Sequence, residues 1–187
     1  MEITQRFTIN QPIDVVWRAF SDVRLVADCL AGAEITDIPD DSHCSGRFVV
    51  KLGPISASFK GGAEIIRDDT NYTGMFEGKG LDQQSGSRSQ GKIAYELSQE
   101  NDGRETVIAI KAEFILSGAL AQFGRSSLIN DIAGRLTADF ANTLQQKLSG
   151  ATTGEIQRAM AQDVHAFSLL GSVFWNRIVS VFKRLFG

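Results

Sequence analysis

The alternation of apolar and polar residues predicts one strand at the start of the chain and several more in its middle. In residues 2–10, Ile3, Phe7 and Ile9 fall on one face and charged or hydroxyl side chains fall on the other, as in a half-buried strand. Between about residues 34 and 116 the same period recurs in segments separated by Gly, Pro, Asn and Asp turn signals. We predict six strands there, paired as an antiparallel meander with one face toward a core.

Helical spacing of apolar residues appears on both sides of this meander. A first short helix is expected after Asn10-Gln11-Pro12, with Trp17 within it, and a second over Arg24–Leu30. A long amphipathic helix is expected from Leu120 to Leu148, where large apolar residues recur every four positions. Residues 1–149 therefore predict an α+β domain in which a curved antiparallel sheet packs against the long helix.

Small residues then interrupt the pattern before a second apolar segment. Residues 150–154, Gly-Ala-Thr-Thr-Gly, are typical of a linker. Residues 155–187 form an appended tail with a helical apolar stripe. The tail carries a net charge of +2, which leaves −5 on the rest of a chain whose net charge is −3. The acidic balance argues against a nucleic-acid partner.

Residues that usually carry catalysis are sparse. The two histidines, His43 and His165, stand in no paired metal-ligand spacing, and Cys29 is expected to be a small buried hydrophobic residue rather than a nucleophile. Asp40-Asp41 and Asp68-Asp69 are expected to be solvated turn residues. We predict no catalytic residue, no metal and no cofactor. The first ten residues have no basic-then-apolar pattern, so no signal peptide is expected, and two free thiols fit a reducing compartment.

Four stretches together resemble the CoxG family, which takes its name from carbon monoxide dehydrogenase and belongs to the START-like superfamily. The resemblance covers nearly all of residues 1–149, and it is carried by "VWRAFSDVRLVADCLAGAE", "KLGPISASFKGGAEI", "GKGLDQQSGSRSQGKIAYEL" and "LSGALAQFGRSSLINDIAGRLTADFANTL". It implies a helix-grip fold with a cavity between sheet and helix that takes a hydrophobic ligand. Members of this family are encoded with molybdenum-containing hydroxylases such as carbon monoxide dehydrogenase, and the resemblance supplies no catalytic residue.

The large apolar residues on predicted inner faces are the candidates to line such a cavity. Each of them is also compatible with plain core packing. Small inner-face residues would leave space between the aromatic side chains: Ala57, Gly61, Ala63, Gly91 and Ala112. No buried polar group is evident in the pattern, which favours an extended apolar ligand. The candidate pocket residues are Trp17, Phe20, Phe48, Phe59, Phe76, Tyr95, Phe114, Phe123, Leu128, Ile132, Leu136 and Phe140.

The tail is the candidate membrane-binding segment. Only 13 residues separate Asp163 from Arg177, whereas a membrane-spanning helix needs about 20. A helix lying in the interface of an anionic membrane and a helix docked on protein both remain possible. The residues that would contact the membrane are Phe167, Phe174, Trp175, Ile178, Phe182, Lys183, Arg184, Leu185 and Phe186.

Three functions are compatible with these features. The first is a carrier without enzymatic activity whose pocket holds a hydrophobic molecule, with a quinone the most economical choice given the hydroxylases implied by the resemblance. The second is a recruitment or assembly factor for such an enzyme, and the third is a START-like cyclase acting on an aromatic substrate. The first two predict a cytoplasmic protein that is peripheral at the inner face of the cell membrane.

Overall fold

The computed structural model describes residues 1–52, 55–125 and 127–150. The chain divides into two compact units, Met1–Gln145 and Gln146–Gly187, and the features below belong to the first, apart from the end of α3. Its elements follow the predicted order of one strand, two short helices, six strands and a long helix. They are β1 (Glu2–Ile9), α1 (Ile13–Ser21), α2 (Val23–Cys29), β2 (Ala33–Asp40), β3 (His43–Leu52), β4 (Ile55–Asp68), β5 (Thr73–Asp82), β6 (Ser87–Glu100), β7 (Glu105–Ser117), the 3₁₀ helix η1 (Gly118–Arg125) and α3 (Ser127–Gly150).

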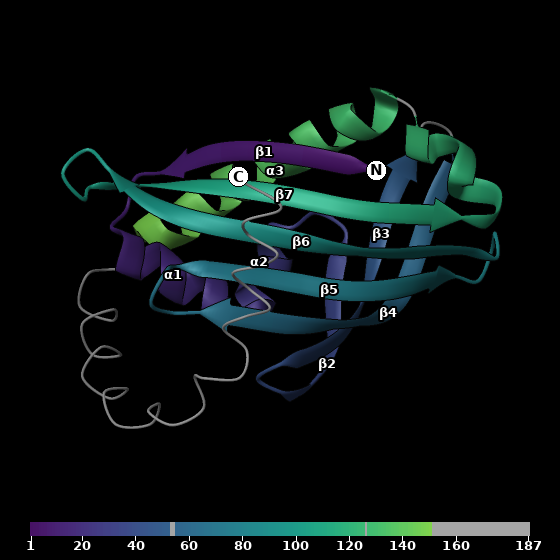
Figure 1. Cartoon of the computed structure of the whole chain (residues 1–187), viewed down its shortest axis with the longest axis horizontal. Helices are drawn as coiled ribbons and strands as arrows, with labels where there is room; N and C mark the ends of the chain where they lie inside the picture. Colours follow the sequence, from purple (N-terminus) through teal and green to yellow (C-terminus); the bar gives the residue numbers. More distant parts are fainter. Residues whose placement is uncertain (53–54, 126, 151–187) are drawn as a thin grey trace. The chain divides into compact units, whose positions relative to one another are not determined.

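The seven strands form a single antiparallel sheet in the order β1-β7-β6-β5-β4-β3-β2. Figure 1 shows the sheet curling, with β2 and β3 turned across the direction of β5, β6 and β7, and with the helices on one side of it. We call this helix-bearing side the inner face. The predicted fold class, a helix-grip fold with a curved sheet and a long C-terminal helix, is confirmed.

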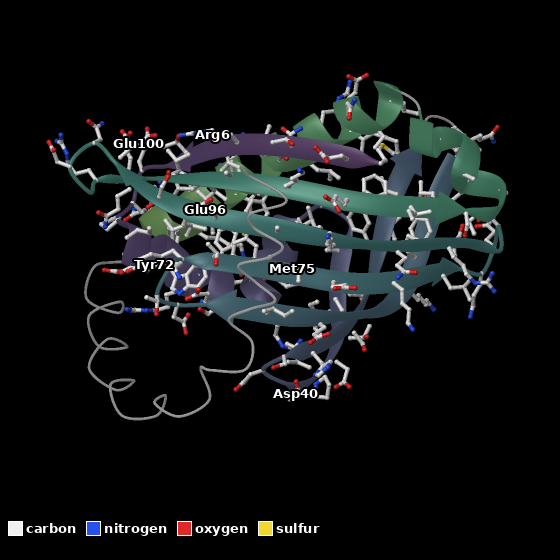
Figure 2. All side chains as sticks on the ribbon, in the orientation of Figure 1. Arg6, Asp40, Tyr72, Met75, Glu96 and Glu100 are labelled. Atoms are coloured by element: carbon white, nitrogen blue, oxygen red, sulfur yellow. The ribbon has the colours of Figure 1, made fainter. Side chains whose placement is uncertain are left out.

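The outer face of β1, β6 and β7 carries charged side chains in pairs. Arg6 Nη2 lies 3.0 Å from Glu100 Oε1, and Figure 2 shows this pair near the end of the sheet, with Glu96 also on the outer face. Lys92 Nζ lies 3.3 Å from Glu113 Oε2. Ion pairs at a solvent-accessible surface contribute about 0–1 kcal/mol each. These strands therefore follow the predicted alternation, because their charged residues gather on the face away from the helices.

One end of the inner face is filled by rings from α1, α3 and four strands or turns. Tyr95 is the hub of this aromatic cluster, with its ring centroid 5.1 Å from that of Phe20, 5.9 Å from that of Phe76 and 6.1 Å from that of Trp17. Phe140 of α3 joins it through Phe20 at 6.0 Å. Offset and edge-on ring pairs at these separations add to the burial of their area. The cluster consists of Phe7, Trp17, Phe20, Tyr72, Phe76, Tyr95 and Phe140.

The other end of the inner face is closed by η1. Ala57, Phe59, Leu120 and Ile129 form a buried apolar cluster there, which we call the η1 cluster. A 3₁₀ helix has three residues per turn, so residues three apart lie on the same side. Leu120 and Phe123 both pack into the η1 cluster for this reason.

The long helix begins later than predicted. The expected start at Leu120 is wrong, because residues 118–125 form η1 and α3 starts at Ser127. Gly118 has a φ of +80°, and the backbone N–H of Leu120 donates to Ser87 Oγ at 3.0 Å, which attaches the start of η1 to β6. Gly150, the first residue of the predicted linker, is the last residue of α3. Residues 151–154 and the tail lie outside the described residues.

The two short helices begin in different ways. α1 begins after Pro12, as expected, and no side chain caps it. α2 spans Val23–Cys29, and the Asp22 carboxylate accepts from the N–H groups of Arg24 and Leu25 at 3.0 and 3.1 Å. Such N-caps stabilise a helix by about 1 kcal/mol.

Replacing Ser87 should loosen the attachment of η1. Ser87 is fully buried and its hydroxyl oxygen accepts from Leu120 N–H, so Ser87→Ala leaves a buried donor unpaired. We expect the free energy of unfolding to fall by about 2 kcal/mol, measured by urea denaturation. The control is Ser117→Ala, because Ser117 is exposed and its hydroxyl makes only a long hydrogen bond, to Arg88 O at 3.5 Å. Equal effects of the two substitutions would contradict this role of Ser87.

Candidate ligand-binding site

A band of small residues crosses the inner face between the aromatic cluster and the η1 cluster. The register places Gly46, Gly61 and Gly80 directly opposite one another on β3, β4 and β5. In the neighbouring row, Gly78 of β5 lies opposite Ala63 of β4 and Gly91 of β6. No large side chain rises from the sheet at these positions. The small-residue band consists of Gly46, Gly61, Ala63, Gly78, Gly80, Gly91 and Ala112.

Solvent reaches the inner face beside this band. Along β6, Tyr95 and Leu97 are 2% and 3% exposed, whereas Ile93, on the same face, is 45% exposed. Ile93 lies opposite Ala112 of β7 and Phe76 of β5. A large aliphatic residue on the inner side of a sheet is normally covered by the core. α1 and η1 therefore close the two ends of the inner face, and an apolar area near its middle stays accessible to solvent.

The first half of α3 lies over this area. Ile132 packs against the η1 cluster, and Phe140 belongs to the aromatic cluster. Leu136 is one helical turn from each, on the same stripe, and so faces the region between the two clusters. Leu136 is half-buried, whereas Phe140 and Leu144 further along the helix are buried. The helix is thus more closely packed toward its C-terminal half than over the small-residue band.

The residues predicted to line a pocket divide by burial. Trp17, Phe20, Phe59, Tyr95 and Phe140 are buried in the two clusters. The seven that are half-buried are Phe48, Phe76, Phe114, Phe123, Leu128, Ile132 and Leu136.

The small residues expected to leave space also divide. Gly61, Ala63, Gly91 and Ala112 belong to the small-residue band. Ala57 is fully buried in the η1 cluster and leaves no space.

The inner face also holds buried polar groups, contrary to the expectation that it has none. Arg67 follows Ile65 on the inner face of β4, opposite Gly74. Its guanidinium carbon lies 4.1 Å from the centre of the Trp17 ring, and its Nη2 lies 3.3 Å from Asp69 Oδ1. Within the described part of the chain, Arg67 Nη1 and the Tyr95 hydroxyl are buried without a hydrogen-bond partner.

These two groups are neighbours. A Cβ atom on Gly74 would overlap the Tyr95 hydroxyl, so the Tyr95 ring extends across β5 toward the position opposite Arg67. Burial raises the pKa of Tyr95 to about 12, although the nearby Arg67 charge lowers it. Tyr95 therefore keeps its proton at neutral pH. Sequence reasoning missed Arg67, although its place two residues after Ile65 in the strand alternation was a usable signal.

The other candidate groups have structural roles. Cys29 and Cys44 are buried thiols, and burial raises the pKa of Cys44. Asp68 accepts from the N–H groups of Thr70 and Asn71, as a turn residue does. On the surface, His43 Nδ1 lies 2.8 Å from Asp40 Oδ1, and this hydrogen bond lowers the pKa of Asp40.

Two further features concern the described residues alone. No three of their His, Cys, Asp or Glu side chains gather in a way that would hold a metal ion. None of their helices has the length and apolarity needed to cross a bilayer. The predicted membrane-binding residues of the tail lie outside this part of the chain.

The resemblance noted in the sequence is confirmed by comparison with protein families. The family model that describes the CoxG subunit of carbon monoxide dehydrogenase matches residues 6–149. The chain belongs to this family. A search of curated proteins found no match to the sequence.

Solved structures with the same fold include three of known origin. A conserved protein from Geobacillus kaustophilus has a TM-score of 0.69 at 13% identity, covering 80% of this chain and 95% of that one. The Zhui aromatase/cyclase from Streptomyces sp. R1128 has a TM-score of 0.55 at 14% identity, covering 80% and 93%. A START superfamily protein from Mycobacterium smegmatis has a TM-score of 0.53 at 12% identity, covering 81% and 99%. These similarities establish the START-like fold. Together with the CoxG family, that fold indicates binding of a hydrophobic ligand.

Proposed function

We propose that this CoxG protein is a carrier that binds a lipophilic molecule, in the first instance a quinone, over the small-residue band, and has no catalytic activity of its own. The exposure of Ile93 on the inner face is the observation that carries this proposal. An apolar surface beneath a helix stays in contact with water at a free-energy cost of about 25 cal/mol for each Å². A bound apolar molecule would remove that contact.

The surrounding side chains favour a flat apolar ligand over a charged one. The half-buried Phe48, Phe76 and Phe114 all point to the inner face beside the small-residue band. Ligand sites of this kind are mostly apolar with a few polar groups that fix orientation. A quinone has both a planar ring and an apolar chain. It would also connect a molybdenum hydroxylase, the partner implied by the CoxG family, to electron carriers of the membrane.

The amphipathic tail supports a membrane connection. Its sequence places Phe174, Ile178 and Phe182 on one side of a helical wheel and Lys183 and Arg184 on the other. Aromatic and basic residues separated in this way favour the interface of an anionic membrane. In this proposal the tail brings the protein to the inner surface of the cell membrane, where quinones reside.

Introducing an amide at Leu136 should weaken ligand uptake. Leu136→Gln would place a polar group against the bound molecule, and an unpaired amide in an apolar site costs about 1–3 kcal/mol. We expect the dissociation constant for a short-chain quinone to rise at least about tenfold, measured by equilibrium dialysis. Lys60→Gln is the control, because Lys60 is exposed on the opposite face of β4.

An independent test extracts bound lipophilic molecules from the protein purified from its native host and identifies them by mass spectrometry. A lipophilic molecule at near-stoichiometric amount supports a carrier and identifies its cargo. If no molecule is recovered and no quinone binds, the carrier proposal is wrong, and the recruitment or assembly factor becomes the better account.

A further inference from the structure

We propose that Arg67 and Tyr95 form a two-donor anchor for an uncharged oxygen acceptor on the ligand, such as a quinone carbonyl. The inference rests on the proposed ligand-binding function and adds to it the chemistry of the ligand's polar end. It places that end beside Arg67 and Tyr95, next to Phe76, and the apolar remainder over the small-residue band.

Two unpaired donors in one buried place carry this assignment. Tyr95 is 2% exposed, yet its hydroxyl bonds to nothing on the described chain, and the same holds for the buried Nη1 of Arg67. Leaving one buried polar group unsatisfied costs about 1–3 kcal/mol, so two neighbouring cases need an explanation. The third unsatisfied group, Thr73 Oγ1, belongs to the position opposite Glu96 on the outer face and is not part of this site.

The anchor lies within reach of the open part of the inner face. Tyr95 follows Ile93 by two residues on the same face of β6, which is a distance of about 7 Å along the strand. Phe76 lies beside both, since it is opposite Ile93 and its ring is 5.9 Å from that of Tyr95. A planar head group entering past Ile93 would therefore meet Phe76 and then the two donors.

The donors select an acceptor that carries no full charge. Arg67 donates whatever the pH, and Tyr95 remains protonated at neutral pH, so both groups offer hydrogens. The Arg67 charge already has a carboxylate neighbour in Asp69, which also accepts from Trp17 Nε1 at 2.8 Å. A carbonyl oxygen accepts two hydrogen bonds and would satisfy both donors without adding a second negative charge.

The test compares three probes with the same alkyl chain. One carries a quinone, one carries no polar group and one carries a carboxylate. They are 2-hexyl-3,5,6-trimethyl-1,4-benzoquinone, the corresponding hydrocarbon hexyltrimethylbenzene, and 4-hexylbenzoate. The quinone ring is fully substituted so that it does not add to Cys29 or Cys44. Equilibrium dialysis with mass-spectrometric quantification gives a dissociation constant for each probe, and the ratio of variant to wild type removes differences in probe hydrophobicity.

The variants are Tyr95→Phe and Arg67→Met, each with a matched control. Tyr72→Phe removes a hydroxyl from the same aromatic cluster, but one that donates to the exposed Asp14 at 2.8 Å. Arg6→Met removes an arginine from the outer face. We expect the quinone dissociation constant to rise about fivefold in Tyr95→Phe and at least about tenfold in Arg67→Met. The hydrocarbon ratio should stay within about twofold, and neither control should change the quinone ratio.

Each other outcome counts against a defined part of the inference. If quinone and hydrocarbon weaken equally in both variants, Arg67 and Tyr95 act only on packing, and the anchor is wrong while the carrier stands. If hexylbenzoate binds wild type more tightly than the quinone does, the acceptor is a carboxylate and the uncharged assignment is wrong. If wild type binds none of the probes, the quinone assignment and the anchor are wrong, and the carrier proposal fails as well if extraction of the native protein recovers no lipophilic molecule. Should Arg67→Met not fold, Tyr95→Phe decides alone, because it removes only a hydroxyl that bonds nothing on the described chain.

Discussion

Gly61→Ala is expected to lower the free energy of unfolding by about 3 kcal/mol, because the backbone of β5 approaches Gly61 too closely to leave room for a side chain. A Cβ atom at Gly61 would overlap the carbonyl oxygen of Lys79 on β5. That oxygen is backbone and moves only if the pairing of β4 with β5 shifts. For a chain of this length the melting temperature should fall by about 6–12 °C.

The neighbouring glycine provides a matched control. Gly62 is on the same strand and is also exposed, but its side chain would point to the outer face. A Cβ atom there lies 3.2 Å from the carbonyl oxygen of Cys44 and 3.4 Å from Ser45 Oγ, contacts that small adjustments relieve. We expect Gly62→Ala to change stability by less than about 0.5 kcal/mol. Thermal and urea denaturation of both variants decide the matter, and a harmless Gly61→Ala would show that the close approach of β5 is not needed.

The fold was predictable because the strands have one buried face. The alternation in residues 55–65 placed Ala57, Phe59 and Ile65 on the same side, and the structure has all three on the inner face. The four-residue recurrence after Leu128 likewise predicted the stripe of α3 that faces the sheet. Patterns of this kind are local, so they survive in a single sequence.

The 3₁₀ helix was not predictable from the same patterns. Leu120 and Leu128 continue the apolar recurrence of the long helix, so periodicity alone extends that helix over them. The start of η1 is held by a contact across the chain, between the Leu120 N–H and the hydroxyl of Ser87, 33 residues earlier. Helical wheels contain no information about such a partner.

The candidate site was predictable in part, for a similar reason. The aromatic residues were assigned to the inner face correctly, but their division into two clusters follows from strand register. Register also aligns Gly46, Gly61 and Gly80 across three strands. Arg67 was overlooked because an arginine at a strand end is usually solvated, whereas here Trp17 covers it.

Charged substitutions on the apolar side of the tail are expected to abolish membrane binding. Phe174→Glu combined with Phe182→Glu would place two carboxylates where the proposed helix enters the interface. Full-length wild type should sediment with vesicles that contain phosphatidylglycerol, and the double variant should remain in the supernatant. The double variant leaves the small-residue band unaltered, so the affinity of this variant for a short-chain quinone should match that of wild type. Loss of both properties would mean that the substitutions act on folding instead.

Neutralising the basic side of the tail should have a smaller effect, and one that depends on salt. Each basic residue near an anionic surface contributes about 1 kcal/mol to binding. Replacing Arg177, Lys183 and Arg184 with Gln should therefore weaken vesicle binding by up to about 3 kcal/mol. The difference from wild type should shrink at about 0.5 M salt, because screening removes most of the attraction in wild type as well. The control for overall charge replaces three exposed lysines of the first unit with Gln. They are Lys51, Lys60 and Lys79. If this control weakens binding as much as the tail variant, the attraction comes from general charge. If wild type ignores the vesicles altogether, the aromatic and basic faces of the tail are better explained by docking on a protein.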